Sequence, residues 1–378
     1  MSAQKETLWP AKPHTIAKIQ ILEEYLYPYF QIIGRSYSNS ILYVDGFAGP
    51  GKYTNHSTGS PIAALRAAAK VVAGAAGDFK ASSIIAVFVE KDHSRSEHLV
   101  QTVQPFEKND RIKIYCFEDE FTNAVKKIQT DFPSVFNSHP AFYFIDPFGP
   151  TPVPFTLVSE ILANPKAEVF LNLDADGINR IFCAGDFANA RMNLDSIFGD
   201  NLNWPSEFAS ARTNQERGRR SLKIYKDNLK KAGVEYRFSF EMRNKSDQLD
   251  YFLLFATHHP LGLLKMKEAM KRISGNSSYQ FSDARVGNYD LFTSDSADVA
   301  HFANQMHKDF ENKNRTYRQL NDYALNETPL LNPKKMLAKL ENEDKIIVTA
   351  EATRRKGDFP EKKIKSVSFK SYGKNLFD

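Results

Sequence analysis

A strand-like apolar run, Ile41–Val44, leads into a loop that contains three glycines. Glycine lets the backbone adopt turns that side chains forbid, and it lets the main chain approach a bound ligand closely. A phosphate-binding P-loop is disfavoured, because Lys52 is followed by Tyr53 rather than by the Ser or Thr that such a loop requires. We therefore predict that the loop binds an adenosine-type cofactor through Asp45, Gly46, Phe47, Gly49 and Gly51.

Acidic residues also follow the next two strand-like runs. Glu90 ends the run Ile84–Val89, which is where an acid commonly accepts hydrogen bonds from ribose hydroxyls. It lies about twice the usual ~20 residues beyond the glycine loop, which we attribute to an insertion over residues 56–83. The alternative is a surface acid that merely ends a strand. After the third run, Ile112–Phe117, the residues Glu118 and Glu120 are candidates for contact with an adenine amine.

A carboxylate, a proline and an aromatic residue follow the fourth run, Phe142–Ile145, in the order Asp146, Pro147, Phe148. Such a carboxylate can accept a hydrogen bond from the exocyclic amine of a base while the aromatic ring stacks on that base. The amine nitrogen would then attack an electrophilic methyl group. The alternative interpretation is a rigid loop that only closes the pocket.

The order of predicted elements decides which fold positions these residues. Five strand-like runs, the last of them Val169–Leu173, alternate with helix-like segments, and this alternation predicts a parallel sheet with helices on both faces. Two more runs, Tyr236–Phe240 and Tyr251–Ala256, are separated by too few residues for a crossover helix, so this pair should be antiparallel. Seven strands with an antiparallel last pair are typical of a Rossmann-like class I methyltransferase fold, whose cofactor is S-adenosylmethionine.

Helices and a second module complete the predicted organisation. Apolar spacing predicts a helix over His14–Phe30, and Ser60-Pro61 opens another that runs to about Ala69. Residues from about 176 to 222 should form a helical insertion within a methyltransferase-like domain of residues 1–310. Residues 311–378 read as helix, helix, strand, basic loop and strand, which is the order of a winged helix. The alternative for this module is a capping subdomain used for dimerisation.

Composition indicates an ordinary globular protein, with 42% hydrophobic and 25% charged residues. No apolar run approaches the roughly 18 to 20 residues of a membrane span. The chain has two cysteines and no apolar leader, so we expect a soluble protein of the reducing cytoplasm without a metal site.

The net charge of +5 is mild, but basic residues concentrate in two stretches, one within residues 212–231 and one within residues 311–378. Separate basic patches of this kind fit the binding of a polyanion such as RNA or DNA. The alternative is a solvated surface that only promotes solubility. The candidate nucleic-acid contacts are Arg217, Arg219, Arg220, Lys223, Arg354, Arg355 and Lys356.

With these motifs in place, the chain closely resembles the three-Cys-motif partner proteins (TcmP). The resemblance spans most of the chain, and its last segments are similar to that family's winged-helix end. It rests on residues 9–15 with Lys18, 44–51, 59–61, 144–149, 172–174 and 255–263 with Met266 and Lys267.

The resemblance implies a genomic partnership with a radical-SAM protein that carries a three-cysteine motif. It also implies a distant relation to bacterial ribosomal-RNA adenine methyltransferases. By that analogy, His14 and Lys18 lie near the carboxylate end of the cofactor or near the target base. Asp146-Pro147 is retained, but Phe148-Gly149 departs from the proline and aromatic residue of those enzymes.

Three functions follow as hypotheses. The first is methyl transfer from S-adenosylmethionine to a base, most directly an adenine amine, in RNA or DNA. The second is a nucleic-acid-binding partner subunit that keeps the methyltransferase fold only as a scaffold. The third is a nuclease, for which Asp146, Asp174 and Asp176 would have to hold a divalent metal ion. The oligomeric state stays open.

Overall fold

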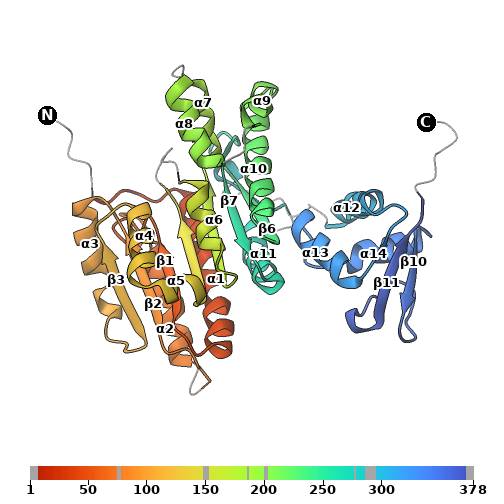
Figure 1. Cartoon of the computed structure of the whole chain (residues 1–378), viewed down its shortest axis with the longest axis horizontal. Coiled ribbons are helices and arrows are strands. Elements are labelled where there is room, and N and C mark those ends of the chain that lie inside the picture. Colours follow the sequence, from red (N-terminus) through yellow and green to blue (C-terminus); the bar gives the residue numbers. More distant parts are fainter. Residues whose placement is uncertain are drawn as a thin grey trace. The chain divides into compact units, whose positions relative to one another are not determined.

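The computed structural model describes residues 7–74, 78–147, 153–184, 187–199, 203–275, 278–285 and 295–371. The chain divides into two compact units (Figure 1). Unit 1 comprises residues 1–273 together with 279–288, and unit 2 comprises residues 274–278 together with 289–378. Residues 274–278 therefore belong to unit 2, residues 279–288 return to unit 1, and the rest of the chain belongs to unit 2.

Unit 1 is built around one eight-stranded sheet with the order β3-β2-β1-β4-β5-β7-β6-β8. The strands β1 to β5 are parallel to one another, and β7 is antiparallel to both β5 and β6. The predicted fold class, including the antiparallel last pair, is therefore confirmed. The strands are β1 (Ile41–Asp45), β2 (Ile84–Val89), β3 (Ile112–Phe117), β4 (Ala141–Ile145), β5 (Ala167–Leu173), β6 (Tyr236–Arg243), β7 (Leu249–Thr257) and β8 (Gln280–Ser282).

The eighth strand corrects the expectation of seven. β8 spans only Gln280–Ser282 and pairs in parallel with β6. Three residues with one aromatic side chain produce no recognisable strand pattern, since the alternation that marks a strand needs at least four residues.

Helices cover both faces of the sheet because successive side chains of each central strand point to opposite sides. On one face, Tyr43 of β1 and Phe142 of β4 stack with their ring centroids 6.1 Å apart, and Phe142 also meets Tyr25 of α1 (Pro13–Ser36). On the other face, Val44 and Tyr143 join the apolar cluster of the later helices. The other helices of unit 1 before the insertion are α2 (Ser60–Gly74), α3 (His93–Val103), α4 (Phe121–Asp131), α5 (Pro133–Ser138) and α6 (Phe155–Leu162).

The expected helical insertion consists of four helices between β5 and β6. They are α7 (Ala175–Cys183), α8 (Phe187–Phe198), α9 (Trp204–Ala209) and α10 (Asn214–Lys231). The last of them extends past the expected end near residue 222, because Ile224, Tyr225 and Leu229 continue its buried face against the sheet. After β7, α11 (Pro260–Ser274) completes the helices of this unit. None of the helices in the described part of the chain is long and apolar enough to cross a membrane.

Unit 2 has its own core of apolar side chains. Its elements are α12 (Asp295–Asp309), β9 (Asn314–Arg315), α13 (Tyr317–Glu327), α14 (Lys334–Asn342), β10 (Ile346–Ala350) and β11 (Ile364–Phe369), with the strand order β10-β11-β9. Ala303 and Met306 of α12 are fully buried in this core. Unit 2 thus includes α12 as well as the elements after residue 311, the expected start of the second module.

A buried carboxylate ties α1, β5 and β7 together. Glu168 of β5 accepts hydrogen bonds from the hydroxyl of Tyr25 and, at 2.9 Å, from the hydroxyl of Thr257. Burial raises the pKa of Glu168 to about 7 from its ordinary 4.5, although both hydrogen bonds oppose this shift. The carboxyl group therefore holds a proton in the folded protein at pH values where it is ionised in the unfolded chain.

We expect the free energy of unfolding to fall as the pH rises from about 5 to about 8. Between the two pKa values, the folded state binds more protons than the unfolded state. This contribution to the free energy of unfolding is therefore lost as the pH rises through the pKa of the folded state, about 7. Denaturant titrations at several pH values should show a shallower decline for Glu168→Gln. The exposed Glu160 on α6 gives the matched control, since Glu160→Gln should keep the wild-type slope.

Candidate functional site

The order of the central strands brings two carboxylates together. β1 lies between β2 and β4, so the direction in which strands are added to the sheet reverses between β1 and β4. Ligands of open α/β sheets bind beyond the carboxyl ends of the strands at such a switch point. Asp45 ends β1, and Asp146 directly follows β4.

The glycine loop is fastened to the neighbouring strands by its backbone. The Gly46 amide donates to the carbonyl of Phe144 and the Ala48 amide to that of Val89, both at 2.9 Å. Gly49 and Gly51 have φ angles of 59° and 82°, a region that favours glycine. These bonds and turns hold the loop in one shape above β1 and β2.

Asp45 is fully buried at the start of this loop. Its Oδ1 accepts a hydrogen bond from the Phe47 amide at 3.3 Å, whereas its Oδ2 has no partner of normal geometry among the described residues. Burial raises its pKa to about 7, and the nearby Ser60 hydroxyl offsets part of this effect. A buried carboxylate oxygen without a donor, such as this Oδ2, is suited to a ligand that carries N–H groups.

The other expected cofactor residues divide into buried and exposed ones. Phe47 packs on Phe121 with 5.6 Å between ring centroids. Glu90 is buried at the end of β2, and its Oε1 accepts from the Asp92 amide at 2.8 Å. Glu118 and Glu120 are exposed, and Glu118 is paired with His93 at 2.9 Å, which raises the pKa of that imidazole.

Asp146 is held from two sides. Lys18 of α1 forms an ion pair with its Oδ2, and the Asn172 amide nitrogen at the end of β5 donates to its Oδ1 at 2.8 Å. The Lys18 side chain is 9% exposed, and its ammonium lies 5.4 Å from the ring centroid of Tyr251. Each oxygen of Asp146 therefore already accepts one interaction. Lys18, which was expected near the carboxylate end of the cofactor or near the target base, contacts this carboxylate.

His14 lies one helical turn before Lys18. Its backbone amide and its Nδ1 both meet Asp283, at 2.9 and 2.8 Å, and its ring packs edge-on against Tyr251. Asp283 directly follows β8. The bonds of His14 thus fix the start of α1 against the last strand of the sheet.

Several residues at this site were not singled out from the sequence. Burial and the charges of Asp146 and Asp45 raise the pKa of Tyr53. Trp9 meets Tyr53 edge-on at 5.9 Å. Trp9 and Asn172 lie in segments that carry the resemblance, but their residue types alone suggested no role.

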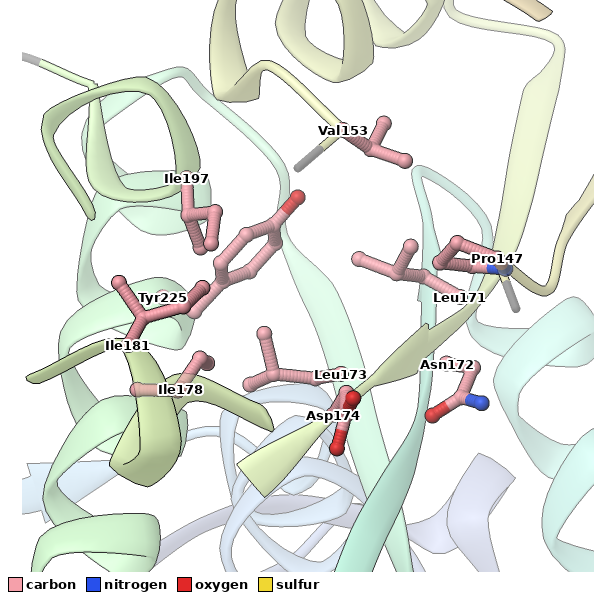
Figure 2. A pocket seen from close by; sticks show the side chains of 10 residues that line it. All are labelled: Pro147, Val153, Leu171, Asn172, Leu173, Asp174, Ile178, Ile181, Ile197 and Tyr225. Carbon is pink, nitrogen blue, oxygen red and sulfur yellow. The ribbon is translucent and has the colours of Figure 1, made fainter. Parts of the chain in front are cut away.

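An apolar hollow lies beside Asp146, at the carboxyl ends of β4 and β5 (Figure 2). We call it the β4–β5 hollow. Pro147, Asn172, Asp174 and Tyr225 line it together with six aliphatic side chains, Val153, Leu171, Leu173, Ile178, Ile181 and Ile197. Pro147 thus forms part of its wall, whereas Phe148 lies outside the described residues.

The basic residues expected to bind nucleic acid are partly engaged within the chain. Arg217 lies 4.9 Å from the Phe182 ring centroid, and Arg220 pairs with Glu216 at 2.5 Å. Arg219 and Lys223 are more exposed, although they lie 3.8 Å from Glu241 and 3.1 Å from Asp227. The patch on α10 is therefore largely balanced by acids.

The consecutive basic residues Arg354, Arg355 and Lys356 of unit 2 have different environments. The guanidinium of Arg354 forms an ion pair with Glu341 of α14, and its side chain is only 10% exposed. It also lies 4.8 Å from the ring centroid of Phe359. Arg354 thus fastens the basic loop to α14, which corrects its expected role as a surface contact. Arg355 and Lys356 are exposed.

The nuclease hypothesis requires a cluster of metal-binding side chains. Among the described residues, no group of three or more His, Cys, Asp or Glu side chains is arranged to hold a metal ion. Asp174 caps α7 by accepting from the Gly177 amide at 2.7 Å, and Asp176 pairs with Arg180 at 3.2 Å. Cys116 and Cys183 are both free thiols.

No protein-family model and no curated protein matches the chain. Solved structures with a similar arrangement include an O-methyltransferase from Bacillus cereus in complex with SAH, with 12% identity over 65% of this chain and 92% of that one, at a TM-score of 0.34. The O-methyltransferase TomG from Streptomyces achromogenes in complex with SAM is 12% identical over 67% and 93%, with a TM-score of 0.34. The N-terminal domain of human METTL16 in complex with SAH is 13% identical over 67% and 73%, with a TM-score of 0.31. The fold assignment itself rests on the strand order described above, which is that of a Rossmann-like class I methyltransferase fold.

Proposed function

We propose that the protein is an S-adenosylmethionine-dependent methyltransferase that acts on a nucleic-acid base, with an adenine amine in RNA or DNA as its expected target. The observation that carries this proposal is the position of Asp45 and Asp146 at the two strand ends that flank the switch point. One carboxylate begins the glycine loop, and the other follows the neighbouring strand, where it would face the methyl acceptor.

The residues around Asp45 fit S-adenosylmethionine. The unpartnered Oδ2 of Asp45 suits the ammonium group of the methionine portion, and the buried Glu90 suits the ribose hydroxyls. When bound, this cofactor supplies an electrophilic methyl group. The left-handed turns at Gly49 and Gly51 support a close approach of backbone and ligand.

The residues around Asp146 would orient the base that accepts the methyl group. Lys18 and Asn172 hold both oxygens of this carboxylate in place, so the carboxylate has a defined orientation. A carboxylate that is already held in one orientation needs little rearrangement when the amine of a substrate base binds.

Unit 2 supports a nucleic-acid substrate. Its order of elements, with β9 before two helices and the β10–β11 hairpin after them, is that of a winged helix. Lys334 and Lys335 in the first turn of α14 are exposed, as are Arg355 and Lys356 in the hairpin loop. Exposed cations of this kind suit contact with phosphates.

A second candidate is a scaffold subunit of the TcmP type, which positions nucleic acid for a radical-SAM protein with a three-cysteine motif. The ion pair between Lys18 and Asp146 favours it, because it occupies the carboxylate that a substrate amine would approach. Co-expression separates the two: stable co-purification with no methyl transfer by the isolated protein supports the scaffold, and methyl transfer by the isolated protein rules it out.

Calorimetric titration with S-adenosylmethionine and S-adenosylhomocysteine tests the cofactor site first. We expect micromolar binding by the wild type and at least a tenfold loss in Gly49→Asp, since the new side chain would fill the space between the loop and Trp9, 3.8 Å from its Cβ position, and add a negative charge beside Asp45. Gly74→Asp is the matched control, because nothing lies within 4 Å of its Cβ position at the end of α2. Absence of binding by the wild type would falsify the enzyme proposal.

A further inference from the structure

Two carboxylates lie on the α1 face of the sheet, at the ends of β1 and β4, but only one of them is paired with a cation. Tyr43 of β1 packs edge-on against Phe30 of α1, and Asp45 follows it by two residues, so both side chains point to this face. Asp146 lies on the same face, because Lys18 of α1 forms an ion pair with it. No cation forms an ion pair with Asp45 within the described part of the chain.

The surroundings of Asp45 leave its charge uncompensated. The side chain is fully buried, its Oδ1 accepts one hydrogen bond of 3.3 Å from the Phe47 amide, and its Oδ2 has no partner among the described residues. Lys18 and Asp146 together carry no net charge, so an ionised Asp45 adds an unbalanced negative charge at a buried position. A carboxylate in such a place takes up a proton, because its neutral form is much less costly to bury.

The ionisable neighbours of Asp45 limit which group can exchange a proton here. Burial, and to a smaller extent the charge of Asp45, raise the pKa of Tyr43 and of Tyr53, so both hydroxyls stay neutral between pH 5 and pH 8. Burial raises the pKa of Asp45 itself to about 7, within that range. His98 of α3 contacts the glycine loop, with its Nδ1 2.7 Å from the carbonyl oxygen of Pro50. Any test therefore has to separate Asp45 from this histidine.

We propose that Asp45 holds a proton in the cofactor-free protein and releases it to solvent when the ammonium group of the cofactor binds at its Oδ2. This inference rests on the proposed function for the identity of the ligand. The O–H bond of the carboxylic acid breaks, and the carboxylate that remains accepts an N–H of the ammonium. The bound state therefore contains one carboxylate and one cation, and the buried charge stays balanced.

The sign of the pH dependence follows from this exchange. The ligand binds the ionised form of Asp45, so its affinity is highest above the pKa of the free site and falls below it. With a pKa of about 7, about 90% of the sites hold the proton at pH 6, and the dissociation constant should rise about tenfold between pH 6 and pH 5. The amino group of the free cofactor is ionised at both pH values, because an α-amino group has a pKa of roughly 7.7–8.0.

Calorimetric titration of the full chain with S-adenosylmethionine at about pH 6 counts the released protons. The observed binding enthalpy is compared between phosphate and imidazole buffers, whose ionisation enthalpies differ. We expect about 0.9 proton released per bound cofactor. Glu168→Gln and His98→Gln are the controls and should both keep this release. The first removes the other carboxyl group whose pKa is raised to about 7, and the second removes the histidine at the glycine loop.

Asp45→Asn should bind the cofactor at least tenfold more weakly and release no proton. Infrared difference spectra of the wild type give a second measurement, in which the carbonyl band of a protonated carboxyl group should disappear when the cofactor is added. Binding without proton release, retention of that band, or release that persists in Asp45→Asn or is lost in His98→Gln overturns the inference and leaves the proposed function standing. Absence of binding at both about pH 6 and about pH 8 contradicts the proposed function, and the inference with it.

Discussion

Replacing Asp146 with alanine is expected to lower methyl transfer by about a hundredfold or more while leaving the affinity for S-adenosylmethionine within a few-fold. The change removes the carboxylate that both Lys18 and Asn172 contact, so the amide of Asn172 and the ammonium of Lys18 lose their common anchor. Misplacement of an orienting group by about 1 Å can by itself cost such a factor. Methyl transfer is measured with tritiated cofactor and RNA or DNA, and affinity by calorimetry.

The control for this change is Asp131→Ala, which removes an exposed carboxylate at the end of α4 that pairs with Lys127 in the preceding turn. It should leave both quantities unchanged. Parallel loss of transfer and cofactor affinity in Asp146→Ala would move Asp146 to the cofactor side of the site. Loss of neither would remove it from the site altogether.

Gly59→Ala is expected to destabilise unit 1 by about 1–3 kcal/mol, the usual range for inserting a methyl group into a packed region. A Cβ at Gly59 would lie 2.5 Å from the carbonyl oxygen of Gly51 and 2.7 Å from its carbon. Both are backbone atoms of the glycine loop, so no side chain can rotate away to relieve the clash. The Gly59 amide also donates to this carbonyl at 2.9 Å, and the bond would have to lengthen.

The free energy of unfolding of Gly59→Ala is measured by denaturant titration. Calorimetry should also show weaker binding of S-adenosylmethionine, because the backbone of Gly51 shifts. Gly74→Ala at the other end of α2 is the control, since its Cβ would meet open space and alanine favours helix over glycine. Equal free energies of unfolding for the two variants would contradict the prediction, because they would show that the backbone at Gly51 can move to accommodate a methyl group at Gly59.

The strands that build the site could be predicted because they are continuous apolar runs buried on both faces. Phe142–Ile145 and Ile84–Val89 are examples whose boundaries the structure keeps within one residue. The residues at their carboxyl ends, Glu90 and Asp146, follow directly from that register. Parallel strands that are buried by helices on both faces show this continuous apolar pattern in the sequence, whichever helices cover them.

The partners of those residues could not be predicted, because they depend on where helices cross the sheet. Lys18 and Asp146 are 128 positions apart, and no local pattern reports that α1 brings an ammonium to the end of β4. Charge runs were misleading for a related reason. Arg354 reads like its exposed neighbours Arg355 and Lys356, but Glu341 draws its guanidinium inward.

The path of the chain between the two units has a consequence for how they could have been joined by gene fusion. After α11 the chain enters unit 2 at residues 274–278 and returns to unit 1 to form β8 and present Asp283 to His14. An ancestral domain that ended with α11 would have lacked both the edge strand and this anchor of α1. The natural junction for recombination or domain exchange therefore lies beyond residue 285, after the sheet is complete.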